Sequence, residues 1–157
     1  MTSGGVTKSE FDRRSLQKES EYDALTLCLT FSEREILYKR IDFRCEKMIS
    51  DGLIEETKAL IARGVFKKNA TAAGAIGYKE LFGYIEGRCS LEESLDELKQ
   101  ATRNYAKRQN TWFSAPRVRK YLTEVEMCRD GGTRTFEEIV NIARGHFLNF
   151  FFCDKIN

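Results

Sequence analysis

Residues 90–116, SLEESLDELKQATRNYAKRQNTWFSAP, decide the fold class because they predict one long helix. Ser90 followed by Glu93 is typical of a capping box at a helix start. Apolar residues then recur at helical spacing, and Pro116 stops the helix just after Phe113. A chain organised around a helix of this length is expected to be mainly α.

Shorter helical segments are predicted on both sides of this stretch. Ser32 with Glu35 predicts a second capping box, for a helix that Asp51-Gly52 interrupts or ends. The remaining predicted segments are a helix over 53–63 before Gly64, a loop over 65–73, a short helix over 75–86 before Gly87, a linker over 129–133, and a last helix capped by Thr135 and Glu138 and running to about 150.

Strand signals are sparse. Residues 25–30, LTLCLT, alternate with a period of two, and the only other candidate is the short run at 121–123. An isolated strand cannot satisfy its own backbone hydrogen bonds. Either these two strands pair with each other, or their partners lie outside the chain.

Composition fits one globular domain and excludes several classes. The 157 residues are 41% hydrophobic and 32% charged, with 26 basic against 24 acidic side chains. No apolar stretch approaches the roughly 20 residues of a membrane helix. Five cysteines without a CxxC pair, and His146 as the only histidine, argue against a disulfide framework and a zinc site, zinc fingers included. A cytoplasmic location is expected.

Charge is uneven along the long helix. Its first half is acidic, whereas residues 101–120 contain no acid and six basic residues, namely Arg103, Lys107, Arg108, Arg117, Arg119 and Lys120. Lys99, Arg103 and Lys107 repeat every four residues and predict one ridge. Basic residues interleaved with Tyr105, Trp112 and Phe113 suit nucleic acid, through phosphate contacts and stacking. The alternative is a solvated basic face above an aromatic core.

Several polar residues interrupt apolar stripes. Arg44 is predicted to project among Leu37, Ile41 and Met48, with Arg40 on the flank. A guanidinium at this position needs either a water-filled cleft or an anion opposite it, and the anion is a structural carboxylate or a phosphate. In the long helix, Thr102 and Gln109 occupy core positions and need buried partners or a ligand.

Gly77 lies within AIGYKEL (75–81), where glycine costs about 1 kcal/mol relative to alanine in a helix. Close approach of another backbone or of a ligand would explain this glycine, and so would a frayed helix start. The neighbouring Tyr78 and Lys79 have the chemistry to stack on a base and to contact phosphate.

These features occur together in a recognisable order. The stretches are LYKRIDFR (37–44), the segment from Met48 to Glu56, AIGYKEL (75–81), YIEG (84–87) and TRNYAKRQNTWF (102–113). In this order they resemble the tRNA dimethylallyltransferases, also called tRNA isopentenyltransferases, over roughly residues 20–125.

The resemblance implies a reaction and its partners. Family members transfer a dimethylallyl group from dimethylallyl diphosphate to N6 of adenosine 37, beside the tRNA anticodon, and the adenine leaves its stack to react. Mg²⁺ is implied at the diphosphate, with ligands outside this chain. A monomer without membrane association is implied too.

The chain also departs from the family pattern. It has no GxxxxGK[ST] loop, and residues 4–9, GGVTKS, have the wrong glycine spacing. We therefore expect the helical C-terminal part of a P-loop α/β enzyme, with one or two short strands left over from the missing sheet. The expected division is a polar tether (1–23), the tRNA-binding helical part (24–125), and a C-terminal linker and helix outside the clear resemblance (126–157).

Site residues carry over only at matching positions. Arg44, with Arg40, is implied to bind the diphosphate. Contacts with the tRNA anticodon stem-loop are implied for Gly77, Tyr78, Lys79, Arg103, Lys107, Arg108, Gln109, Thr111 and Trp112. No catalytic residue or metal ligand is predicted, because the family's phosphate-binding loop and general-base aspartate precede this region, and the chain alone is expected to be inactive. The alternatives are a truncated, non-catalytic RNA-binding helical module and a helical protein-interaction domain.

Overall fold

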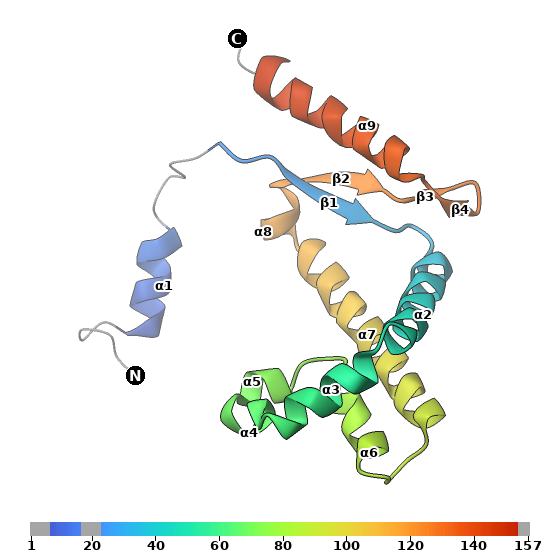
Figure 1. Cartoon of the computed structure of the whole chain (residues 1–157). Coiled ribbons are helices and arrows are strands. Elements are labelled where there is room, and N and C mark those ends of the chain that lie inside the picture. Colours follow the sequence, from blue (N-terminus) through green and yellow to red (C-terminus); the bar gives the residue numbers. More distant parts are fainter. Residues whose placement is uncertain (1–6, 17–22, 154–157) are drawn as a thin grey trace.

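A computed structural model describes residues 7–16 and 23–153 of the chain, which is mainly α as expected (Figure 1). The helical elements are α1 (Lys8–Leu16), α2 (Arg34–Ser50), α3 (Leu53–Ala62), α4 (Val65–Lys68), α5 (Ala70–Ala73), η1 (Lys79–Leu81), α6 (Phe82–Ile85), α7 (Leu91–Phe113), α8 (Pro116–Arg119), α9 (Phe136–Leu148) and the π-helical turn η2 (Asn149–Cys153). The strands are β1 (Thr26–Thr30), β2 (Leu122–Glu126), β3 (Cys128–Arg129) and β4 (Gly132–Thr133).

Helix α7 forms the axis of the domain, as its sequence predicted. The Glu93 N–H donates to the Ser90 hydroxyl at 3.1 Å, and the Ser90 N–H donates to the Glu93 carboxylate at 2.7 Å. This capping box satisfies backbone donors that an open helix start leaves unpaired. The predicted end is confirmed too, since Ser114 caps the helix and Pro116 begins α8.

The main core lies where α2 and α3 meet the N-terminal half of α7 (Figure 1). Its buried members come from α2, α3, η1 and α7, namely Ile41, Cys45, Leu53, Ile54, Leu81 and Leu98. Gly52, with φ of 102°, makes the sharp turn between α2 and α3 that brings these faces together. The C-terminal half of α7 extends beyond this core towards the strands.

Strands β1 and β2 pair with each other in parallel, which is the first of the two alternatives left by the sequence. The register runs from Thr26 opposite Leu122 to Thr30 opposite Glu126. Helix α9 lies along this pair (Figure 1) and packs against β2, where Val125 is buried. The strand pair therefore lies between the C-terminal end of α7, which leads through α8 into the start of β2, and the start of α2, which follows the end of β1 (Figure 1).

Glu126 joins the ends of both strands to the segment that leads into α2. Its carboxylate accepts hydrogen bonds from the N–H of Ser32 at 3.1 Å and of Cys128 at 2.7 Å. Burial raises the pKa of Glu126, but these backbone donors outweigh burial and lower the pKa overall. The predicted capping box at Ser32 is wrong, because α2 starts at Arg34 after the N-cap Glu33, whose side chain forms no capping hydrogen bond.

Other local predictions need correction. The predicted loop at 65–73 contains α4 and α5, because Phe66 packs on Tyr78 and Phe82 with ring centroids 5.5 and 5.1 Å away. The predicted linker at 129–133 contains the β3–β4 hairpin, in which Asp130 and Gly131 take positive φ values of 45° and 77°. Helix α1 lies within the segment expected to be a tether, and the domain division itself stays a prediction.

In the described ranges, no helix is both long and apolar enough to cross a membrane.

Candidate nucleic-acid interface

The two predicted diphosphate ligands lie on an exposed side of α2. The face of α2 that packs on the core contains Tyr38 and Cys45 as well as Ile41. Because of Tyr38 and Cys45, the centre of this packed face lies further from Arg44 than the predicted apolar stripe did. Arg40 and Arg44 are both exposed, and neither forms an ion pair with a described residue. The prediction that Arg44 lies at the centre of the apolar stripe is therefore wrong. Its role at the diphosphate stays a prediction that rests on the family resemblance.

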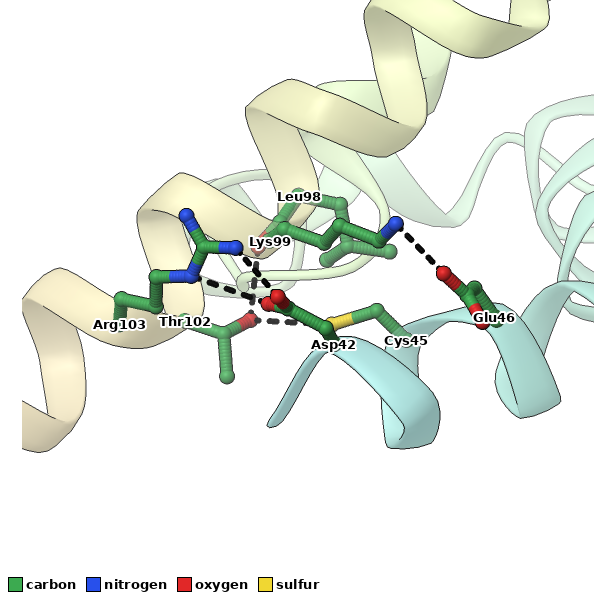
Figure 2. A network of polar contacts seen from close by, with 7 residues as sticks. All are labelled: Asp42, Cys45, Glu46, Leu98, Lys99, Thr102 and Arg103. Atoms are coloured by element: carbon green, nitrogen blue, oxygen red, sulfur yellow. Dashed lines mark hydrogen bonds and ion pairs between the residues drawn. The ribbon is translucent and has the colours of Figure 1, made fainter. Parts of the chain in front are cut away.

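Two members of the predicted basic ridge, Arg103 and Lys99, form ion pairs between α7 and α2 (Figure 2). Arg103 donates from Nε to Asp42 Oδ1 at 3.0 Å and from Nη2 to Oδ2 at 2.5 Å, and both side chains are 29% exposed. Lys99 Nζ donates to Glu46 Oε1 at 2.6 Å. These carboxylate hydrogen bonds raise the pKa of Arg103 and of Lys99. We call the two pairs the α2–α7 clamp.

The polar residues predicted in the core of α7 have separate environments. The Thr102 hydroxyl donates to the Leu98 carbonyl at 2.8 Å and accepts from the Cys45 thiol at 3.8 Å (Figure 2). Thr102 is thus satisfied without a ligand. Gln109 is exposed, which corrects its predicted core position, and it lines a pocket between β1 and α7.

The segment 75–86 is a turn followed by η1 and α6, which corrects the prediction of one helix. Gly77 has φ of 112°, a conformation that breaks the helix and that L side chains rarely adopt. The Tyr78 hydroxyl donates to Glu56 at 2.7 Å, and this hydrogen bond raises the pKa of Tyr78. Lys79 is exposed, with its Nζ 3.5 Å from Glu80. Backbone conformation explains the glycine without a ligand.

The C-terminal end of α7 and the following α8 form a surface pocket lined by basic side chains and a tryptophan. We call it the cationic pocket, and its lining residues are Lys107, Arg108, Thr111, Trp112, Ala115 and Arg117. Trp112 is 53% exposed and meets Phe113 edge to face, with ring centroids 4.9 Å apart. The guanidinium of Arg108 lies over the Tyr105 ring at 5.6 Å. Within the described chain, the side chains of Lys107, Arg108 and Arg117 form no ion pairs.

The cationic pocket brings together four of the predicted tRNA contacts and leaves the other five elsewhere. Lys107, Arg108, Thr111 and Trp112 share it, whereas Gln109 faces the other pocket and Arg103 belongs to the clamp. Arg117 was not among the predicted contacts. The signal for it was the acid-free basic stretch 101–120, which includes Arg117, and the helix α8 that begins at Pro116 places this residue at the pocket.

This arrangement suits a phosphate-rich ligand with exposed bases. Guanidinium and ammonium groups that form no ion pair with a described residue are available to phosphate oxygens, and a half-exposed indole offers a stacking face.

The fold and the site together define a helical domain on a parallel strand pair, as found in larger α/β proteins. The IPP transferase (IPPT) family model matches residues 1–117, which includes the segment before the first recognisable stretch. The chain belongs to the IPP transferase family.

Individual relatives agree with this assignment. The chain is 52% identical over 134 residues to a tRNA dimethylallyltransferase of Alkaliphilus oremlandii, covering 84% of this chain and 41% of that protein. It is 43% identical over 141 residues to one of Halalkalibacterium halodurans, covering 90% and 43%. The chain thus spans less than half the length of these relatives.

Solved structures show the same similarity. The full-length tRNA isopentenylpyrophosphate transferase of Bacillus halodurans superposes with a TM-score of 0.67 at 33% identity, covering 92% of this chain and 47% of that one. A tRNA isopentenylpyrophosphate transferase of Staphylococcus epidermidis gives 0.68 at 32% identity, covering 86% and 41%. The expected family and the mainly α fold are confirmed.

Proposed function

We propose that this chain is the helical, tRNA-binding part of a tRNA dimethylallyltransferase. The whole protein would transfer a dimethylallyl group from dimethylallyl diphosphate to N6 of adenosine 37 in tRNA. Family membership and the names of the relatives support the reaction class. The observation that carries the RNA-binding role is the cationic pocket, where three basic side chains that form no ion pair with a described residue line the same pocket as Trp112.

The residues of the cationic pocket have distinct parts in this proposal. Lys107, Arg108 and Arg117 contact phosphates of the anticodon stem-loop, which positions the RNA without reading its sequence. Trp112 stacks on an unpaired base, an interaction available in loops and not in duplex RNA. Arg103 acts indirectly, because the clamp holds α7 against α2.

The donor side of the reaction rests on Arg44 and Arg40. Both guanidinium groups are exposed on α2 and available to a diphosphate. Mg²⁺ at the diphosphate, with ligands outside this chain, belongs to the proposal for the whole protein. The described residues contain no cluster of three or more potential metal ligands. A cytoplasmic, monomeric enzyme is part of the proposal.

Charge reversal in the cationic pocket tests RNA binding. We expect Lys107→Glu with Arg117→Glu to weaken binding of an anticodon stem-loop RNA, and to reduce the slope of log Kd against log salt by about one per lost phosphate contact. Lys58→Glu, at an exposed lysine of α3, is the matched control. Unchanged affinity in the double variant would exclude this pocket as an RNA site and favour a protein-interaction domain.

A single-turnover assay tests whether prenyl transfer needs residues outside this chain. The chain alone, mixed with dimethylallyl diphosphate and RNA, is expected to give no N6-prenylated adenosine, because it lacks the family's phosphate-binding loop. Prenylated RNA in this assay would contradict the proposal that the transfer needs residues outside this chain.

A further inference from the structure

Glu80 is a buried carboxylate that the proposed contacts do not use. It is only 7% exposed, and it lies in η1, between the turn at Gly77 and helix α7. Its Oε2 accepts a hydrogen bond from the Gly77 N–H at 2.8 Å. Its Oε1 has no hydrogen-bond partner among the described residues, and the Lys79 ammonium is 3.5 Å away.

This placement is costly for stability alone. A carboxylate withdrawn from water loses solvation that one backbone donor and one exposed lysine compensate only in part. An apolar side chain of similar size would fill the same space without that cost. The carboxylate is therefore better explained by what it holds in place than by core packing.

Glu80 holds the turn that precedes it. Gly77 adopts φ of 112°, and the backbone hydrogen bonds across the turn are long, at 3.3 Å from Tyr78 N–H and 3.4 Å from Lys79 N–H to the Ala75 carbonyl. The 2.8 Å bond from Gly77 to Glu80 is the shortest of the three. The shape of this turn thus depends on one side chain.

We infer that Glu80 is a positioning residue for RNA binding. It fixes the turn at Gly77, and so holds Lys79 at the surface for a phosphate of the same RNA. Lys79 exchanges its contact with Glu80 for the RNA phosphate on binding. This inference rests on the proposed function, because it assumes that the chain binds RNA through its basic side chains.

Three substitutions separate the two contacts of Glu80. Glu80→Gln keeps an oxygen that accepts from the Gly77 N–H, Glu80→Asp keeps the charge on a side chain too short to reach it, and Glu80→Ala removes both. Glu86→Ala, at an exposed glutamate paired with Arg88, is the matched control. Affinity for the stem-loop RNA and its salt slope are measured well below the melting temperature of each full-chain variant.

We expect Glu80→Gln and Glu86→Ala to bind within about twofold of wild type, and Glu80→Ala to bind about 5 to 20 times more weakly, since misplaced contacts lose affinity steeply. Glu80→Asp should behave like Glu80→Ala. In both, the salt slope should fall by about one, the effect of losing one phosphate contact.

The outcomes distinguish this inference from the proposed function. Suppose that folded Glu80→Ala or Glu80→Asp binds RNA with wild-type affinity and salt slope, while the Lys107→Glu, Arg117→Glu variant loses binding. This result would overturn the role of Glu80 and leave the proposed function in place. Unchanged binding in the Lys107→Glu, Arg117→Glu variant would remove the proposed function itself. If neither Glu80→Ala nor Glu80→Asp folds, Glu80 is a stability determinant and the inference is also wrong.

Discussion

The α2–α7 clamp gives a measurable coupling between Asp42 and Arg103 (Figure 2). Replacement of either residue by alanine removes two hydrogen bonds, at 3.0 and 2.5 Å, and leaves the partner charge half-buried. Replacement of Arg103 also removes its contact with the Tyr38 ring at 5.6 Å. The three variants are Asp42→Ala, Arg103→Ala and the double substitution.

The magnitude follows from the exposure of the pair. Exposed ion pairs contribute about 0.2–1 kcal/mol, and loss of one partner from a fully buried pair costs about 3–5 kcal/mol. Both side chains are 29% exposed, between these limits. We expect a coupling energy of about 1.5 kcal/mol. Arg103→Ala should cost about 0.5 kcal/mol more than Asp42→Ala, because it also loses the cation–π contact.

Urea unfolding of the four proteins gives the coupling energy as a double-mutant cycle. The exposed pair of Lys47 and Asp51, at 3.0 Å, is the matched control and should show about 0.3–0.5 kcal/mol. Additive effects of Asp42→Ala and Arg103→Ala, to within about 0.3 kcal/mol, would refute the clamp as a stabilising contact between α2 and α7.

Two further predictions concern stability. Glu126 has a pKa below its ordinary value in the folded chain, so its stabilising effect is present above the unfolded pKa and is lost as the pH falls through the folded pKa. In urea unfolding at a series of pH values, Glu126→Gln should therefore reduce the loss of unfolding free energy on the acid side, and a pH profile like that of wild type would contradict this. Gly77→Ala should lower the free energy of unfolding by about 1–2 kcal/mol, because alanine is strained at the positive φ of this position. Gly145→Ala lies within α9, where nothing is within 4 Å of the new methyl group, and it should raise the free energy of unfolding by about 0.5–1 kcal/mol. Equal melting temperatures for the two variants would contradict this.

Local signals in the sequence predicted the long helices well. The capping boxes at Ser90 and Thr135 depend on residues three positions apart, so the sequence contains the whole interaction. The same pattern misled at Ser32, whose backbone N–H is held by Glu126, a residue 94 positions away. A contact over that separation cannot be inferred from local spacing.

The sequence likewise predicted those parts of the candidate site that lie within one helix, and not those that depend on contacts between helices. The cluster of basic and aromatic residues at the end of α7 follows from one helix, and the structure gathers it in the cationic pocket. The partners of Arg103 and the exposure of Arg44 depend on how α2 meets α7, which periodicity in a single helix does not determine. The turn at Gly77 was missed because good helix formers surround it, and its φ is set by packing and by Glu80.

The parallel pairing of β1 with β2 bears on how the chain folds. Thr30 and Glu126 are 96 positions apart, so this pairing must close a large loop before any of its hydrogen bonds form. The helices between the strands form through contacts that are nearer in sequence, and they can assemble first. We therefore expect closure of the strand pair to be the slow step of folding, and the two strand segments to be the part of the chain that remains open to aggregation until it is complete.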